Sequence, residues 1–92
     1  MQPEWNVIGY VISSKYRLSV LRQLSASAST PTQLASSTAT STTHVSRALR
    51  QLGEFDLVSL TVPDDQTKHR LYEITSRGKS TWEAIRTHGL SD

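Results

Sequence analysis

The tetrapeptide Thr30-Pro31-Thr32-Gln33 predicts the start of a helix within narrow limits, and it constrains the fold more than any other segment. Thr30 can cap the helix, and Pro31 suits the first helical position, where a backbone N–H would have no partner. The Gln33 side chain can reach back to the backbone of Thr30 and complete a capping box. Only two apolar residues follow, so we expect a helix of about two turns, ending in a polar turn over residues 36–40.

A second helix start follows at Ser41, which precedes a run with helical periodicity. One face of this run is apolar, with Val45, Ala48, Leu49 and Leu52. The opposite face is polar and basic, with Thr42, Thr43, Ser46, Arg47 and Arg50. The helix can end at Gly53 or run on to Phe55, with Asp56 in the left-handed conformation that ends it. We expect the second end, over residues 42–55, because Phe55 continues the apolar face. The sequence therefore predicts a helix-turn-helix over residues 31–55.

The segments before this motif favour helices. Residues 4–12 have apolar side chains at helical spacing, although their β-branched and aromatic content also suits a strand. Ser13 or Ser14 can cap a clearer helix that runs to Leu24.

The segments after the motif favour a hairpin and a last helix. Two strand-like runs, 57–62 and 70–75, flank a turn over residues 63–68, and a helix over 76–89 follows a cap at Thr75 or Ser76. We therefore expect one domain over residues 1–92, mainly α with a small β-hairpin (α+β). This order of elements is a winged helix-turn-helix, with the wing at residues 57–75.

The charge is distributed unevenly along the chain. The net charge is only +2, but residues 5–53 carry five basic side chains and no Asp or Glu: Lys15, Arg17, Arg22, Arg47 and Arg50. Such a distribution is typical of a surface that approaches phosphates, and equally of a solvated surface that lacks acids. Because an α-helix fits the major groove, we expect the helix over 42–55 to read double-stranded DNA with its first turns.

Individual side chains have specific roles open to them. Arg47 can pair with guanine or with a phosphate, Arg50 is better placed for the backbone, and His44 can contact DNA or pack half-buried. Wing residues Lys68 and Arg70 can follow the sugar-phosphate edge. The full set of candidate DNA contacts is Thr32, Gln33, Ser41, Thr42, Thr43, His44, Ser46, Arg47, Arg50, Lys68 and Arg70.

Several classes of function are disfavoured. The chain has no Cys and only three widely spaced His, so we expect no disulfide, no metal and no cofactor. No catalytic spacing or Gly-rich phosphate loop is present, so we expect no enzyme. We also expect no membrane association and a cytoplasmic location, because apolar runs are short and no secretory leader is recognisable. A small chain cannot cover all its apolar side chains, so we expect a homodimer interface at Trp5, Ile8, Trp82 and Ile85.

Short motifs along nearly the whole chain resemble archaeal winged-helix transcriptional regulators of the ArsR/MarR-like kind. The most specific is the run from His44 to Leu49, and the others are Ser13 to Leu18, Thr30-Pro31, Leu57-Val58, Leu71-Tyr72, Thr75 and Gly78-Lys79. This resemblance implies a homodimer on a palindromic operator, with residues 42–47 in the major groove and the terminal helices at the interface. One departure is Asp56, where the group commonly has Gly.

The sequence thus predicts a sequence-specific double-stranded DNA-binding transcriptional regulator, acting as a dimeric repressor. The main alternative is a winged-helix module for protein–protein contact without DNA readout. That alternative requires an apolar outer face on the helix over 42–55, whereas this face is rich in Thr, Ser and Arg.

Overall fold

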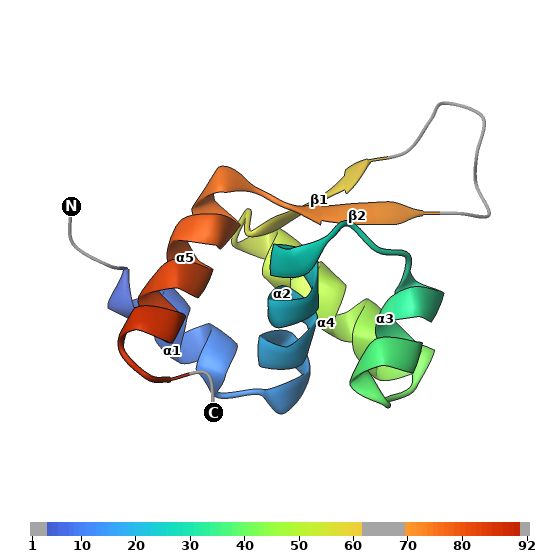
Figure 1. The fold of residues 1–92 in the computed structure, drawn as a ribbon, viewed down its shortest axis with the longest axis horizontal. Coiled ribbons are helices and arrows are strands. Elements are labelled where there is room, and N and C mark those ends of the chain that lie inside the picture. Colours follow the sequence, from blue (N-terminus) through green and yellow to red (C-terminus); the bar gives the residue numbers. More distant parts are fainter. Residues whose placement is uncertain (1–3, 62–69, 91–92) are drawn as a thin grey trace.

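The structure, a computed structural model, describes residues 4–61 and 70–90. Five helices and a two-stranded antiparallel sheet make up this part of the chain (Figure 1). In chain order they are α1 (Trp5–Ile12), α2 (Lys15–Ala26), α3 (Pro31–Thr38), α4 (Thr42–Glu54), β1 (Val58–Thr61), β2 (Leu71–Ile74) and α5 (Ser76–Thr87). The expected fold, mainly helical with a small hairpin, is confirmed, and residues 5–12 of the first segment are helical rather than extended.

Four of the five described helices begin at a capping side chain: Ser14 for α2, Thr30 for α3, Ser41 for α4 and Thr75 for α5. α1 follows Glu4 without a side-chain cap. The Ser14 hydroxyl accepts from the backbone N–H of Arg17, and the Ser41 hydroxyl does the same for His44. Thr30 and Gln33 form the complete predicted capping box: the Gln33 N–H donates to Thr30 Oγ1 at 3.2 Å, and the Thr30 N–H donates to Gln33 Oε1 at 2.9 Å. These local bonds satisfy donors that the first helical turn leaves unpaired, which fixes each start.

The turn between α3 and α4 is shorter than predicted. The expected polar turn over residues 36–40 is wrong in its first part, because α3 continues through Thr38. The hydroxyl of Ser37 donates to the carbonyl oxygen of Gln33 at 3.0 Å, and that of Thr38 donates to Leu34 at 2.6 Å. Polar side chains thus remain compatible with the helix by bonding to its own carbonyls. Ala39, with φ of 56°, then ends it in the left-handed conformation.

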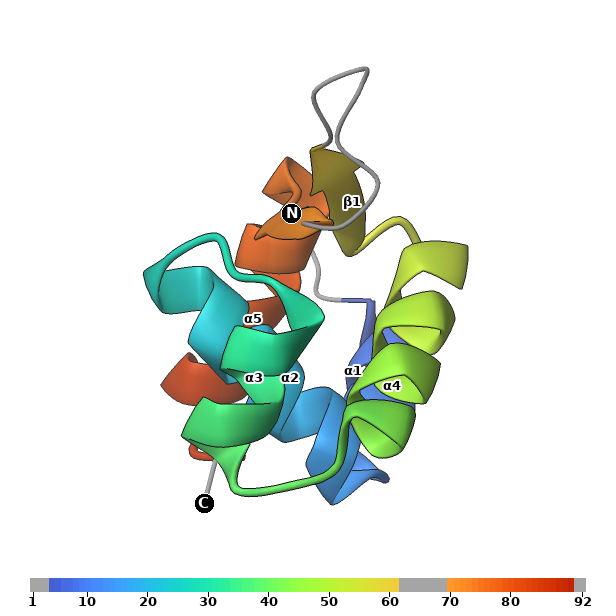
Figure 2. The same cartoon turned by 90° about the vertical axis from the view of Figure 1, so that its right-hand side faces the viewer.

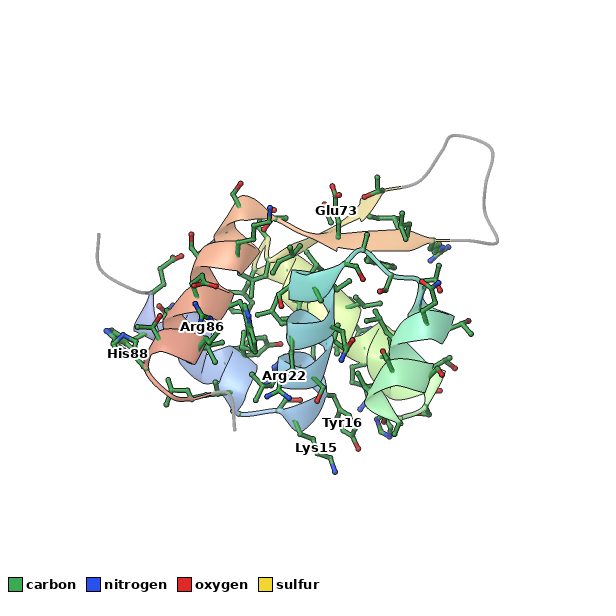
Figure 3. The ribbon with its side chains drawn as sticks, viewed as in Figure 1. Lys15, Tyr16, Arg22, Glu73, Arg86 and His88 are labelled. Atoms are coloured by element: carbon green, nitrogen blue, oxygen red, sulfur yellow. The ribbon has the colours of Figure 1, made fainter. Side chains whose placement is uncertain are left out.

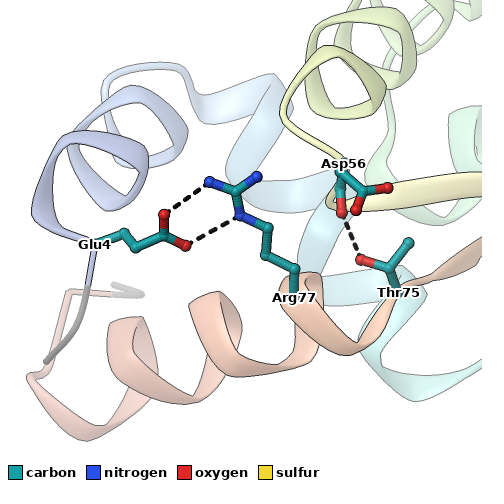
Figure 4. Close-up of polar contacts among 4 residues, drawn as sticks. All are labelled: Glu4, Asp56, Thr75 and Arg77. Atoms are coloured by element: carbon teal, nitrogen blue, oxygen red, sulfur yellow. Dashed lines mark hydrogen bonds and ion pairs between the residues drawn. The ribbon is translucent and has the colours of Figure 1, made fainter. Parts of the chain in front are cut away.

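The end of α4 follows the prediction closely. Asp56 has φ of 58°, and the backbone N–H of Leu57 donates to the carbonyl of Leu52 at 3.0 Å. This bond across the left-handed residue is a Schellman-type closure. The Asp56 carbonyl in turn accepts from the Thr75 hydroxyl at 2.6 Å (Figure 4). The chain therefore leaves α4 in a fixed direction toward the hairpin.

The hairpin is joined to the helical body by a third backbone segment. β1 and β2 pair with Val58 opposite Ile74 and Thr61 opposite Leu71. Ser29, in the link between α2 and α3, exchanges two backbone hydrogen bonds with Tyr72, of 3.0 and 2.9 Å. β1 begins one residue later than predicted, and β2 lacks the first and last residues of the predicted strand over 70–75. Residue 62 and the predicted turn over 63–68, with Lys68, lie outside the described residues.

A single hydrophobic core fills the space between the helices and the base of the hairpin. α1 and α5 lie together at one end of the molecule and α3 at the other, with α2 and α4 between them (Figure 1). The core side chains are Val7, Ile8, Val11, Val20, Leu21, Leu24, Leu34, Val45, Ala48, Leu49, Leu52, Leu57, Val58 and Ile85. Within the described residues, no helix combines the length and the apolar character needed to cross a bilayer.

Candidate nucleic-acid interface

One face of α4 is buried and the other is open to solvent. The predicted apolar stripe of α4 lies in the core, so its polar and basic side chains point outward. We name the exposed set the α4 outer face: Thr42, Thr43, Ser46, Arg47 and Arg50. Figure 2 shows α4 along one side of the molecule, with its outer side turned away from the other helices.

The electrostatics of the α4 outer face favour an anionic partner. The five side chains together line a shallow depression that contains two guanidinium groups and no carboxylate. The first turn of α4 carries no acidic residue, so its positive helix-dipole end is not neutralised locally. Hydroxyl groups of Thr42, Thr43 and Ser46 supply neutral donors and acceptors beside the two charges. This combination can contact both phosphates and base edges.

A second depression lies between α4 and the hairpin, and we name it the wing groove. Leu60 is 46% exposed at its edge, although it follows the buried Val58 on the same face of β1. Arg50 and Arg70 supply the charge. Its remaining lining residues are Pro31, Ser46, Leu49, Gly53, Val58, Ser59 and Tyr72.

The wing groove is continuous with the α4 outer face, because Ser46 and Arg50 line both. The acidic residue on β2, Glu73, alternates with Tyr72 and points to the other side of the hairpin (Figure 3). The sequence prediction included Arg70 here but missed Leu60 and Tyr72. The period-2 alternation from Val58 to Leu60 was the signal available for Leu60.

The other predicted contact residues differ in their surroundings. Thr32 and Gln33 are exposed at the start of α3, and Ser41 is exposed where it caps α4. His44 is half-buried, and its ring stacks on Tyr16 with centroids 4.3 Å apart and an interplanar angle of 2°. Of the two roles open to His44, the structure shows the packing contact.

Two arginines of the acid-free segment are engaged elsewhere. The Arg17 guanidinium donates to three oxygens of the same chain, on Tyr10, Ser13 and Gln51. Arg22 lies over the Trp82 ring, with its guanidinium carbon 5.8 Å from the ring centroid. Lys15 projects from the first turn of α2 (Figure 3). The uneven charge of the sequence therefore does not translate into one continuous basic surface.

The predicted interface residues divide into buried and exposed ones. Ile8 and Ile85 are 2% and 0% exposed, so their assignment to a subunit interface is corrected: they fill the core of their own chain. Trp82 is half-buried beside Arg22. Trp5 is 51% exposed, and its ring makes a T-shaped contact with the His88 ring, with centroids 4.9 Å apart.

Two exposed ion pairs occupy surfaces away from α4. Arg77 donates twice to the Glu4 carboxylate, at 3.0 and 2.7 Å, and links α5 to the start of α1 (Figure 4). These hydrogen bonds lower the pKa of Glu4 from its ordinary value. Arg86 lowers the pKa of Glu83 in the same way within α5. Among the described residues, no group of three His, Cys, Asp or Glu side chains could hold a metal ion.

Together, the capped pair α3–α4 and the hairpin behind it define a winged helix-turn-helix fold. No protein-family model matches the chain, and no curated protein matches its sequence. Solved structures do share its fold, and two of them are described as MarR family regulators.

Three of these neighbours illustrate the likeness. A MarR family transcription regulator superimposes with a TM-score of 0.78 at 19% identity, over 94% of this chain and 60% of that one. A variant of ZitR from Lactococcus lactis gives 0.75 at 21%, over 83% and 52%. MepR from S. aureus, solved as a complex with DNA, gives 0.74 at 20%, over 89% and 69%. The chain thus spans about half the length of the ZitR chain.

Proposed function

We propose that the chain is a sequence-specific double-stranded DNA-binding transcriptional regulator that reads the major groove with α4. The observation that carries this proposal is the α4 outer face, where Arg47 and Arg50 stand exposed among three hydroxyl side chains and no carboxylate. The DNA complex of MepR, which has the same fold, supports it. A module for protein–protein contact alone would need an apolar outer face on α4. The α4 outer face is instead polar and basic.

In this proposal the side chains of α4 divide the work by position. Arg47 forms a bidentate pair with a guanine, and Ser46, Thr42 and Thr43 contact bases or phosphates near the start of the helix. Arg50 lies about one turn further along and pairs with a phosphate. Ser41, Thr32 and Gln33, at the starts of α4 and α3, contribute backbone or side-chain donors to the phosphates of the same strand.

The wing groove receives the sugar-phosphate strand that borders the major groove. Its lining suits an amphipathic backbone: Arg50 and Arg70 pair with phosphates, while Leu60 contacts the apolar side of a deoxyribose. Lys68, two residues before Arg70 in the sequence, adds a further positive charge in this proposal. The sequence preference then comes from α4, and the wing supplies affinity and register.

We further propose that two copies form a homodimeric repressor on a palindromic operator. The apolar side chains that one chain leaves exposed on α1 are Trp5, at 51%, and Ile12, at 36%. Together with Trp82 they form the contact between subunits in this proposal. A two-fold dimer places two α4 helices on successive turns of one face of the duplex.

Selection of bound sequences from a random duplex pool tests the proposal. We expect a symmetric consensus whose half-sites lie about one helical turn apart. The same selection with the Arg47→Ala variant should lose the preference at one position of each half-site. If the duplexes bound by the unmodified chain show no enriched sequence, sequence-specific DNA readout is contradicted.

A further inference from the structure

Two consecutive side chains of α2 contact α4 at two points. The Tyr16 ring stacks on His44, in the first turn of α4, with centroids 4.3 Å apart. The Arg17 Nη1 donates to Oε1 of Gln51 at 3.0 Å. Because His44 and Gln51 are separated by about two helical turns, they lie on the same side of α4.

Arg17 is itself fixed to the corner between α1 and α2. Its Nε donates to the Tyr10 carbonyl at 2.7 Å, and its Nη2 donates to the Ser13 hydroxyl at 2.8 Å. The guanidinium also lies over the Tyr10 ring, 3.9 Å from the centroid. A planar guanidinium with three oxygen partners and a ring beneath it has little freedom to turn. Its bond to Gln51 therefore joins α4 to a rigid corner.

A further contact holds the far end of α4 against the same corner. The Tyr10 ring, on which Arg17 lies, packs against Phe55 with centroids 4.6 Å apart and an interplanar angle of 37°. Phe55 is the C-terminal cap of α4. The contacts to His44, Gln51 and Phe55 thus follow the whole length of the helix.

Arg47 emerges from α4 between the two points that α2 holds. It is three residues after His44 and four before Gln51, so it neighbours both on the helix surface. All three line one depression, together with Tyr16 and Arg17. A small rotation of α4 about its axis would change the direction of Arg47 and of the bases within its reach.

We propose that Tyr16 and Arg17 are positioning residues that set the orientation of α4, and thereby the operator preference, without contacting DNA. The inference rests on the proposed function, since it concerns how α4 reads a duplex. The positioning role also explains why Arg17, a basic residue in the acid-free segment, donates hydrogen bonds to uncharged oxygens of its own chain.

The test compares the affinity for the selected operator with the affinity for a scrambled duplex. Gln51→Ala removes the acceptor of Arg17 on α4 but leaves the bonds of Arg17 to α1 in place. Tyr16→Leu removes the stack on His44 but keeps an apolar side chain. For each variant we expect the affinity ratio to fall roughly tenfold. The affinity for the scrambled duplex and the salt dependence should stay unchanged, because no phosphate contact is lost.

Conservative variants separate positioning from a loss of folding. Tyr16→Phe keeps the ring that stacks on His44, so this variant should retain the ratio of the unmodified chain. Gln23→Ala makes the matched glutamine change on α2, outside this depression, and should also retain it. Circular dichroism with thermal melts confirms that every variant is folded at the assay temperature.

The outcomes are distinguishable. Folded Gln51→Ala and Tyr16→Leu variants with an unchanged affinity ratio would overturn the positioning role and leave the proposed function standing. A reduced salt dependence in an Arg17→Met variant would also overturn it, because Arg17 would then be a phosphate contact. An unmodified chain with no preference among duplexes would overturn the proposed function, and this inference with it.

Discussion

The Thr75 hydroxyl donates to the Asp56 carbonyl at 2.6 Å (Figure 4) and accepts from the backbone N–H of Gly78 at 3.0 Å. One side chain thus bonds to the residue that follows the end of α4 and also caps the start of α5. The backbone N–H of Thr75 adds a third bond, to the carbonyl of Leu57 at 3.0 Å. The segment after α4 and the first turn of α5 are therefore held as a single unit.

Replacing Thr75 by Val should lower the free energy of unfolding by about 1–2 kcal/mol, since a cap and a hydrogen bond to a carbonyl are lost together. Urea denaturation followed by circular dichroism measures this change. Thr75→Ser keeps the hydroxyl and should lie close to the unmodified chain. Equal losses for Val and Ser would contradict this role of the hydroxyl.

The two glycines near this junction should respond oppositely to alanine. A Cβ at Gly78 would lie 2.1 Å from the Leu57 carbonyl oxygen, so α5 approaches the start of β1 too closely for any side chain. Gly78→Ala should cost about 1–3 kcal/mol or more of stability. A Cβ at Gly53 meets nothing within 4 Å, and Gly53→Ala should stabilise α4 by about 0.5–1 kcal/mol. Thermal melts of the two variants give the comparison, and a stable Gly78→Ala variant would argue against the close approach.

Arg47 and Arg50 should differ in what their removal costs. Arg47→Ala should reduce discrimination against the wrong base by about 1–3 kcal/mol, because the proposed bidentate contact between the guanidinium and a guanine is lost. Arg50→Ala should weaken binding to all duplexes alike and reduce the slope of log K against log salt by about 0.9. Gel-shift titrations at several salt concentrations, on the operator and a scrambled duplex, separate the two effects. Identical behaviour of the two variants would mean that both arginines contact phosphates.

Leu60 provides a test of the wing groove. Leu60→Ser should weaken operator binding by about 1 kcal/mol with an unchanged salt slope, since the lost contact is apolar. Arg70→Ala should reduce the slope, because it removes a charge. Stability should change little in either variant, as both side chains are exposed. If Leu60→Ser binds the operator as the unmodified chain does, no sugar lies against this side chain.

The exposed ring of Trp5 should govern the oligomeric state. Trp5→Ser should shift the chain from dimer to monomer at micromolar concentration, because most of the apolar surface offered by α1 is removed. Light scattering at several concentrations measures the mass. Ile8→Ser should instead unfold the chain, since Ile8 lies in the core. A monomeric unmodified chain under the same conditions would refute the dimer.

The starts of the helices could be predicted from the sequence because their causes are local. Thr30, Ser41 and Thr75 each satisfy a backbone donor only a few residues away, so a short window of sequence contains the whole interaction. The left-handed Asp56 was predictable for a similar reason, from the apolar period that ends at Phe55.

Some features could not be predicted because they depend on contacts between distant segments, and the end of α3 was misjudged because of local hydrogen bonds. The sequence predicts Ile8 and Ile85 at a subunit interface because a small chain cannot cover all its apolar side chains, but the packing of α1 beside α5 buries both. The engagement of Arg17 with Tyr10 and Gln51 likewise needs three helices in place. The end of α3 was misjudged because hydroxyl side chains favour turns in general and here bond to helical carbonyls instead.

The two backbone hydrogen bonds between Ser29 and Tyr72 have a mechanical consequence for the duplex. They couple the hairpin to the segment that leads into α3, so the hairpin and the α3–α4 pair form one rigid unit. The spacing between the wing groove and the α4 outer face is therefore fixed. In the proposed complex, a duplex that contacts both surfaces must adjust its groove width to that spacing. Part of the selectivity would then reside in how readily untouched base-pair steps bend.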